Sequence, residues 1–354
     1  MDLKGNDMDQ ICQKIIDAVI ARAEKVCPDS LAFIGVYGSM ATGDVWEKSD
    51  LDLLILIKDN AGWKLGDGFI LDDTDVGYDI YCTNWEMLEG DAACAHAHLS
   101  KLMDAKVVYV KDPDTLDKLD ALRKKAVECL ASEKRFEQAG DALQKAKMCY
   151  AECCLSSSLS QVRTWAGCAV NVLLDAVMLY HGRYFHYGIK RTFEEVSELK
   201  LPFDMAGMVC TVVRAETAQE VTESLKILLC AVRDYLHFPQ NRTEATAENL
   251  RGTYEEMYSN WKNKMVEAAA GNDVFASFMN LLSLQYMIHG LAAETTIEDF
   301  EIMDQFDPAD LAANARAFDG ALQKYLAEYE KHGVEVRHHA NVDAFVTAYL
   351  DRQA

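Results

Sequence analysis

Two apolar runs and the polar segment between them constrain the fold of this chain most strongly. The first run, Leu31–Tyr37, ends at Gly38-Ser39, and the second, Leu51–Ile57, begins directly after Asp50. Both runs are rich in β-branched residues or bounded by turn residues, which is typical of buried strands. The sequence therefore predicts a strand, a glycine-containing turn, and a second strand with acidic residues at its start.

The acidic residues at this point form a pair with a definite spacing. Asp50 and Asp52 are two positions apart, so on a strand their side chains point to the same face. Two adjacent carboxylates repel each other unless a cation lies between them. Mg²⁺ prefers oxygen ligands of this kind, usually together with waters and substrate phosphates. The pair therefore predicts a metal-binding site.

A third acid and the glycine turn extend this prediction. Asp79 lies inside the apolar stretch Gly77–Tyr81, where burying a lone carboxylate would be costly without a metal or a donor. Three acids on neighbouring strands can hold two metal ions for in-line phosphoryl displacement. A turn at Gly38-Ser39 that leads from a strand into a helix would leave backbone N–H groups free to bind phosphate, and the Ser39 hydroxyl would add a donor.

The pattern of the chain changes after about residue 115, where helical periodicity replaces strand signals. Before that point we expect an N-terminal helix, a short strand at Phe69–Leu71, strands at Tyr78–Cys82 and Lys106–Val110, and a helix between the last two. The predicted fold class is α+β. A nucleotide-binding catalytic domain with a small mixed sheet and flanking helices would occupy residues 1–130, a helical bundle 131–240, and a C-terminal helical region 241–354.

Composition limits the classes of function and location. The chain has 354 residues, is 50% hydrophobic and carries a formal net charge of −22, which disfavours nucleic acid as a partner because phosphate backbones are bound by clustered Lys and Arg. No uninterrupted apolar run reaches the ~18–20 residues of a membrane span, and the start lacks the pattern of a secretory signal. The 11 cysteines are odd in number and contain no Cys-x-x-Cys, so we expect reduced thiols in a soluble, cytoplasmic protein.

The order of these motifs resembles the polymerase-β-type nucleotidyltransferase superfamily. Gly-Ser-x-Ala-x-Gly from Gly38, followed by Ser-Asp-x-Asp-Leu from Ser49, is most similar to the aminoglycoside nucleotidyltransferases. The resemblance covers residues 31–115 in detail and 140–236 more weakly. It implies a Mg²⁺-dependent enzyme, with two ions expected, that moves a nucleoside monophosphate from a nucleoside triphosphate, with ATP as the expected donor, to a hydroxyl of a small aminoglycoside-like acceptor and releases pyrophosphate.

The resemblance also implies a role for each motif residue. Asp50, Asp52 and Asp79 would be the catalytic carboxylates and metal ligands, and Gly38 and Ser39 would contact the nucleotide, with Lys48 and Ser49 beside them. Many relatives carry an arginine near Thr42, so here the charge that binds the triphosphate must come from elsewhere. The candidates for that charge are Lys48, Lys145 and Lys147, and the candidates for the general base are Asp79, Glu86 and Glu152, of which Asp79 is the simplest choice.

Other readings of the same sequence stay open. The acidic residues Asp67, Asp72, Asp73 and Asp75 would suit a cationic acceptor such as an amino-sugar. A protein side chain or an RNA end could replace the small acceptor, and a nucleotide-binding regulatory or interaction protein without turnover is a further alternative, although the intact set of acids argues against it. The C-terminal helices could form a homo-oligomer or partner surface, and the sequence does not decide this.

Overall fold

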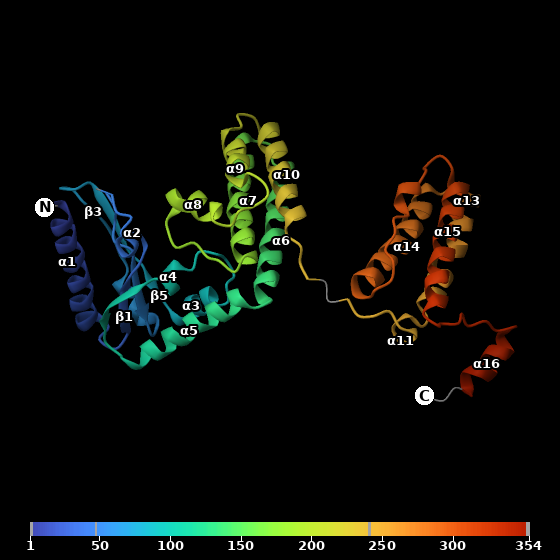
Figure 1. The fold of residues 1–354 in the computed structure, drawn as a ribbon, viewed down its shortest axis with the longest axis horizontal. Helices are drawn as coiled ribbons and strands as arrows, with labels where there is room; N and C mark the ends of the chain where they lie inside the picture. Colours follow the sequence, from blue (N-terminus) through green and yellow to red (C-terminus); the bar gives the residue numbers. More distant parts are fainter. Residues whose placement is uncertain (1–2, 47, 240–241, 352–354) are drawn as a thin grey trace. The chain divides into compact units, whose positions relative to one another are not determined.

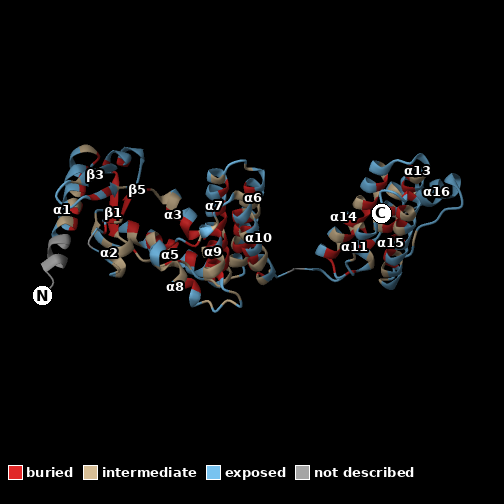
Figure 2. Ribbon diagram, turned by 90° about the horizontal axis from the view of Figure 1, so that it is seen from above, coloured by how far each residue is buried: buried red, intermediate tan, exposed pale blue. Residues whose placement is uncertain are grey.

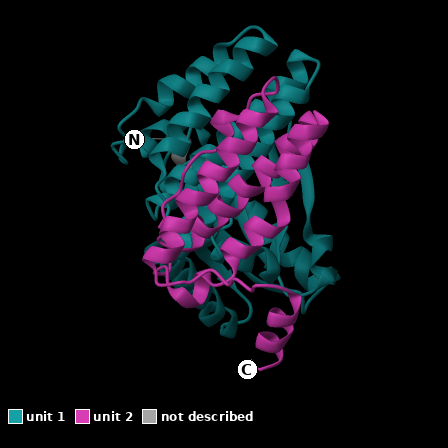
Figure 3. Ribbon diagram, turned by 90° about the vertical axis from the view of Figure 1, so that its right-hand side faces the viewer, with its two compact units in different colours: residues 1–238 teal, residues 239–354 magenta. Residues whose placement is uncertain are grey.

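The computed structural model describes residues 3–46, 48–239 and 242–351, with side chains from residue 10 onward. The chain divides into two compact units, residues 1–238 and residues 239–354 (Figure 3). Each unit has its own hydrophobic core. The predicted boundary at residue 130 falls within helix α5 (Asp114–Ala131), and the one between residues 240 and 241 lies outside the described residues.

The first unit contains a small mixed sheet with the strand order β5-β2-β1-β6. These strands are β1 (Leu31–Val36), β2 (Leu53–Ile57), β5 (Cys82–Thr83) and β6 (Lys106–Val110). β1 runs antiparallel to both β2 and β6, and β2 runs parallel to β5. The predicted α+β class, with a small mixed sheet followed by helices, is confirmed (Figure 1).

Both faces of this sheet are covered, which explains why its strands are apolar at successive positions. Ile34 and Ile55 pack on the side of helix α1 (Leu3–Val26). Phe33 and Leu54 point to the opposite face and join the core formed with the later helices. The alternation of side chains along a strand assigns each residue to one of these two layers.

A separate hairpin follows the sheet's second strand and differs from the prediction. It pairs β3 (Asp67–Leu71) with β4 (Val76–Ile80), and the turn between them places Asp75 at a φ of 52°. The strand predicted at Tyr78–Cys82 is divided in the structure, because its first part pairs with β3 and its last part, β5, pairs with β2. The chain therefore passes from the hairpin directly to the edge of the central sheet.

Helices form the rest of the first unit. Their bounds are η1 (Asn60–Leu65), α2 (Gly38–Thr42), α3 (Trp85–Ala92), α4 (Ser100–Met103), α6 (Lys134–Leu155), α7 (Leu159–Tyr180), η2 (Ile189–Arg191), α8 (Thr192–Ser197), α9 (Met205–Arg214) and α10 (Ala218–Tyr235). Asn84, Ser158 and Thr217 cap the first turns of α3, α7 and α10 with their side-chain oxygens, as expected at helix N-termini. One continuous core joins residues of the sheet, such as Phe33, to residues of α10, such as Leu228.

The second unit is a separate helical assembly. Its helices are α11 (Ala247–Leu250), α12 (Thr253–Met257), η3 (Tyr258–Lys262), α13 (Asn263–Gly271), α14 (Val274–Glu294), η4 (Met303–Gln305), α15 (Leu311–Lys331) and α16 (Val342–Leu350). Phe318, Tyr325 and Tyr329 of α15 are fully buried aromatic residues of its core. Figure 2 shows buried stretches along this helix. Two described helices, α7 and α14, meet a length and hydropathy criterion for crossing a membrane, which buried helices of soluble proteins also meet.

Candidate active site

Gly38 and Asp52 are in direct contact at the end of β1. Gly38 has a φ of 66°, and a Cβ at this position would lie only 1.9 Å from Oδ2 of Asp52. The backbone N–H of Tyr37 also donates to the carbonyl of Asp52, at 3.1 Å. Glycine is therefore required at position 38 both by its left-handed backbone and by the carboxylate that occupies the space of a side chain.

The Asp52 carboxylate is strongly perturbed by its surroundings. Burial and, to a smaller extent, the charge of Asp50 raise its pKa to about 6, against the opposing effect of a hydrogen bond from the backbone N–H of Ser39. Asp50 itself is exposed. Two carboxylates that repel each other, one of them partly desolvated, form a donor set that a divalent cation would stabilise. The residues present therefore fit a magnesium ion.

Four acids carry charges that act on the hydroxyl of Tyr37. Burial raises the pKa of its hydroxyl to about 12, and the charges of Asp52, Asp50, Asp91 and Asp79 add to the effect in that order. The three acids singled out in the sequence thus act on one phenol. Asp79 is exposed on β4, opposite Gly68, so no burial penalty applies to its carboxylate. Among the described side chains, no three His, Cys, Asp or Glu residues already form a metal-binding cluster.

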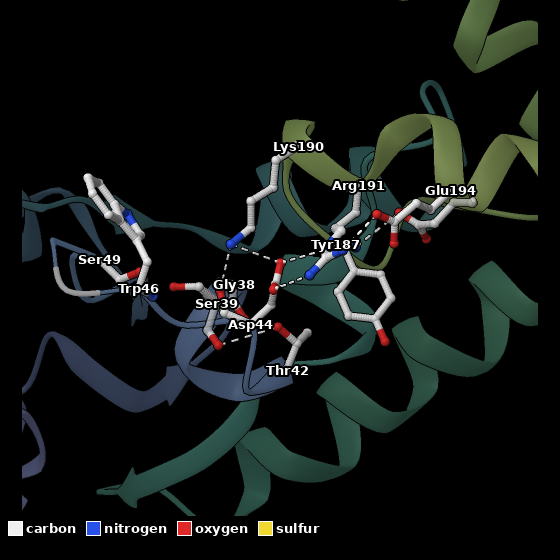
Figure 4. Close-up of polar contacts among 11 residues, drawn as sticks. Gly38, Ser39, Thr42, Asp44, Trp46, Ser49, Tyr187, Lys190, Arg191 and Glu194 are labelled. Atoms are coloured by element: carbon white, nitrogen blue, oxygen red, sulfur yellow. Dashed lines mark hydrogen bonds and ion pairs between the residues drawn. The ribbon is translucent and has the colours of Figure 1, made fainter. Parts of the chain in front are cut away.

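Two adjacent cations from the helical part of the unit contact Asp44, which follows α2. Lys190 Nζ lies 2.9 Å from the carbonyl oxygen of Asp44 and 3.1 Å from its carboxylate. Arg191 donates two hydrogen bonds to the same carboxylate, at 3.0 and 3.2 Å, and pairs with Glu194 at 2.6 Å. Figure 4 shows both side chains extending from η2 toward the segment that contains Gly38 and Ser39. The two cations lower the pKa of Asp44 to about 2.

Lys48 and Ser49, which the sequence placed beside the nucleotide, have local partners. Lys48 Nζ pairs with Asp75 of the β3–β4 turn at 2.6 Å. The Ser49 hydroxyl is buried and accepts a hydrogen bond from the backbone N–H of Trp46 at 3.0 Å, as Figure 4 shows. Ser49 therefore closes the loop that leads to the acid pair.

Four further candidates, two for the general base and two for the charge that binds the triphosphate, are on α3 and α6. Glu86 is exposed in the first turn of α3, and Glu152 is exposed near the end of α6. Lys145 and Lys147 are also on α6. None of these four described residues lines the cavity beside Asp52, and neither do Asp50, Asp79, Lys190 and Arg191.

A cavity of about 830 Å³ adjoins Asp52. Tyr37, Gly38 and Asp52 form one part of its wall, and helices α7, α9 and α10 form another. The segments that contain His98, Ser100 and residues 185–193 complete the wall. This volume is within the range of sites for drug-sized ligands. Its lining residues are Tyr37, Gly38, Asp52, His98, Ser100, Arg163, Ala166, Gly167, Val170, Asn171, Leu174, Phe185, His186, Tyr187, Gly188, Ile189, Thr192, Phe193, Val209, Val212, Val213 and Val221.

The geometry agrees with a comparison against protein families. Residues 20–75 match the family model described as polymerase beta, nucleotidyltransferase. The chain carries a nucleotidyltransferase domain. This domain includes β1, the Gly38-Ser39 turn, the acid pair and β2.

Comparisons with individual proteins give no further information about the site. The crystal structure of a nucleotidyltransferase-like protein from Exiguobacterium sibiricum 255-15 is 13% identical in sequence and covers 80% of this chain and 89% of that chain, with a TM-score of 0.31. A likeness this weak carries no argument about the site. No curated protein shows a significant match to this sequence.

Sequence reasoning missed the residues that come from outside the motif. Lys190 and Arg191 follow Tyr187-Gly188-Ile189, and the only available signal was a pair of neighbouring cations next to a glycine turn. Tyr37 ends the first apolar run and looked like a strand residue.

Proposed function

We propose that this protein is an enzyme that transfers a nucleoside monophosphate from a nucleoside triphosphate to the hydroxyl of a small acceptor. The observation that carries the proposal is the contact between Gly38 and Asp52, next to a second acid, inside a nucleotidyltransferase domain. In the transfer, the acceptor oxygen attacks the α-phosphorus and the bond from that phosphorus to the bridging oxygen breaks. Pyrophosphate leaves with the electron pair, and the hydroxyl proton passes to a base.

Asp50 and Asp52, with Asp79 as a third carboxylate, would hold Mg²⁺. Bound there, the metal would neutralise phosphate charge and polarise the phosphoryl group. The mutual repulsion of Asp50 and Asp52 supports this assignment, because a cation between them relieves it. Asp79 is also the preferred general base, because its charge acts on the hydroxyl of Tyr37, a residue that borders the cavity.

Lys190 and Arg191 would supply the positive charge for the triphosphate. They replace Lys48, Lys145 and Lys147 in this role, because their side chains extend to the segment that begins at Gly38 (Figure 4). Arginine and lysine beside a phosphate form charge-assisted hydrogen bonds, which are about twice as strong as neutral ones. Gly38 and Ser39 would contact the triphosphate through their backbone and hydroxyl groups.

The test is pyrophosphate release with Mg²⁺, each of the four ribonucleoside triphosphates and a panel of hydroxylated small molecules. We expect acceptor-dependent release that EDTA abolishes and that the double variant Asp50→Asn/Asp52→Asn lacks. Asp72→Asn, an exposed acid of the β3–β4 turn, is the matched control and should keep full activity. No nucleotide binding in the presence of Mg²⁺ would overturn the proposal.

The same experiment separates the alternatives. Binding of the triphosphate without release of pyrophosphate would indicate a nucleotide-binding regulatory protein. A mass increase of one nucleotide monophosphate on an added protein would indicate a protein acceptor. The net charge of −22 disfavours an RNA acceptor, for the reason given for phosphate backbones.

A further inference from the structure

The residues that line the cavity beside Asp52 limit the chemical class of acceptor that can bind there. We propose that the acceptor is an uncharged hydroxyl compound with an apolar body, and that Gly167 leaves room for that body. The inference rests on the proposed function, because it takes the ligand of this cavity to be the molecule that receives the nucleotide. It departs from an aminoglycoside-like acceptor.

The wall away from Asp52 is mostly apolar. Val170 and Leu174 of α7, Val209 and Val212 of α9, and Val221 of α10 all border the cavity. These side chains are at most 8% exposed, so the cavity lies over packed core. Ile189 and Val213, which also border the cavity, are 91% and 69% exposed. Exposed apolar surface of this kind gains most from a ligand that removes it from water.

The charges at the cavity do not suit a polycation. Among the described lining residues, Asp52 is the only acid, and the proposed metal would occupy it. Arg163, the one lining residue with a permanent positive charge among those described, is fixed by a hydrogen bond to the carbonyl of Ala215 at 3.0 Å. The acids of the β3–β4 segment, which would have attracted an amino-sugar, do not line the cavity. A cationic acceptor would therefore meet repulsion here without compensating carboxylates.

Gly167 lies within α7 and lines the cavity. A glycine inside a helix lowers its stability relative to alanine. No packing contact requires glycine at this position, because a Cβ would meet no atom within 4 Å. The missing side chain instead adds open volume to the cavity, on the same helix as Val170 and Leu174. This position therefore limits the size of the ligand.

The test measures binding without nucleotide, in a buffer that contains Mg²⁺ so that the charge of Asp52 is neutralised. The probe is 2-(1-naphthyl)ethanol, followed by its own fluorescence, and the matched cationic probe is 2-(1-naphthyl)ethylamine. We expect the alcohol to bind the wild-type chain more tightly than the amine, and the aminoglycoside kanamycin A to compete with neither. Tighter binding of the amine, or displacement of the alcohol by kanamycin A, would overturn the proposal.

Variants at two glycines test the site of binding. Gly167→Leu should raise the Kd of the alcohol about tenfold or more, because the leucine side chain would fill space that the ligand needs. Gly290→Leu is the matched control: this glycine lies in α14, where a Cβ also meets nothing within 4 Å, and the Kd should not change. Gly167→Ala, a smaller change, should give an intermediate Kd. An unchanged Kd in Gly167→Leu would refute the role of this position.

Adding triphosphate separates the two proposals. Nucleotide transfer to kanamycin A would support the transferase and overturn the apolar acceptor. Binding of the alcohol at Gly167, with neither transfer nor nucleotide binding, would overturn the transferase and leave the ligand class of the cavity supported.

Discussion

The contact between Gly38 and Asp52 makes a backbone conformation and a carboxylate that we propose is catalytic depend on each other. We predict that Gly38→Ala will abolish nucleotidyl transfer, because its Cβ would displace Oδ2 of Asp52 from a position 1.9 Å away. The left-handed φ of 66° adds a conformational penalty of about 1–2 kcal/mol. Pyrophosphate release and urea unfolding measure the two effects separately.

Gly43 offers a matched control for this variant. It has a similar φ of 78°, but a Cβ there meets nothing within 4 Å. Gly43→Ala should therefore lower the free energy of unfolding by a similar ~1–2 kcal/mol and keep transfer activity. Equal loss of activity in both variants would show that backbone strain, and not the displacement of Asp52, controls the site.

Lys190 contacts Asp44, which follows the short helix that begins at Gly38 and that we propose binds the triphosphate. Lys190→Ala should raise the KM for the triphosphate about tenfold, the effect of losing one charge-assisted hydrogen bond of ~1.5 kcal/mol. Steady-state kinetics at fixed acceptor concentration measure this change. Asp44→Asn is the control, because it weakens the ion pairs of Asp44 with Lys190 and Arg191 and leaves both cations in place. If Asp44→Asn raises KM as much as Lys190→Ala, the lysine acts by positioning η2.

At the scale of whole elements, a buried acid joins helix α7 to the segment before α4. Asp175 is 7% exposed and accepts a hydrogen bond of 2.9 Å from the backbone N–H of Ala97, which is fully buried. Burial raises the pKa of Asp175, and this hydrogen bond and the nearby imidazole of His98 act in the opposite direction. The carboxylate therefore supports a backbone group that no water could reach.

We predict that Asp175→Ala will lower the free energy of unfolding by about 1–3 kcal/mol, the cost of leaving a buried N–H without an acceptor. Asp175→Asn keeps a carbonyl oxygen that can accept the hydrogen bond from Ala97, so it should lower the free energy of unfolding clearly less. Urea denaturation of the two variants gives the comparison. A loss in Asp175→Asn as large as in Asp175→Ala would show that the negative charge, and not the hydrogen bond, matters.

The elements differ in how far the sequence could predict them. β1 and β2 were predictable because a strand buried on both faces has apolar residues at successive positions, as in Leu53–Ile57. The division of the predicted strand Tyr78–Cys82 into β4 and β5 was not predictable, because it depends on which strand each part pairs with and not on residue type.

Some residues of the candidate site could also be predicted from the sequence, and others could not. The motif pointed to Gly38 and Asp52 because both lie in the one segment that connects β1 to β2. Lys190, Arg191 and the cavity wall depend on helical packing that joins residues more than 140 positions apart. Only the fold brings such residues together, so no local pattern could have identified them.

The whole molecule consists of two units with separate cores, and this has a consequence for stability. One core includes Leu228 and Leu236 of the first unit, and the other is built on Phe318 and Tyr325 of the second. Since the described core clusters do not extend from one unit to the other, each unit should unfold as its own cooperative transition. All the site residues discussed above belong to residues 1–238.

We therefore predict that a chain shortened to residues 1–238 will fold, bind nucleoside triphosphate with Mg²⁺ and keep the melting temperature of the first transition of the full chain. Scanning calorimetry measures this directly. A chain shortened to residues 1–235 is the matched control. It lacks Leu236, which is 4% exposed, and Phe238, whose ring lies 6.0 Å from that of Tyr180.

Losing these two contacts should lower the free energy of unfolding by about 2–5 kcal/mol. For a unit of this size, each kcal/mol lowers the melting temperature by ~2–4 °C, so the melting temperature should fall by several degrees. If the chain of residues 1–238 instead fails to fold, while the full chain melts in a single transition, the two cores stabilise each other and the second unit is required for the integrity of the site.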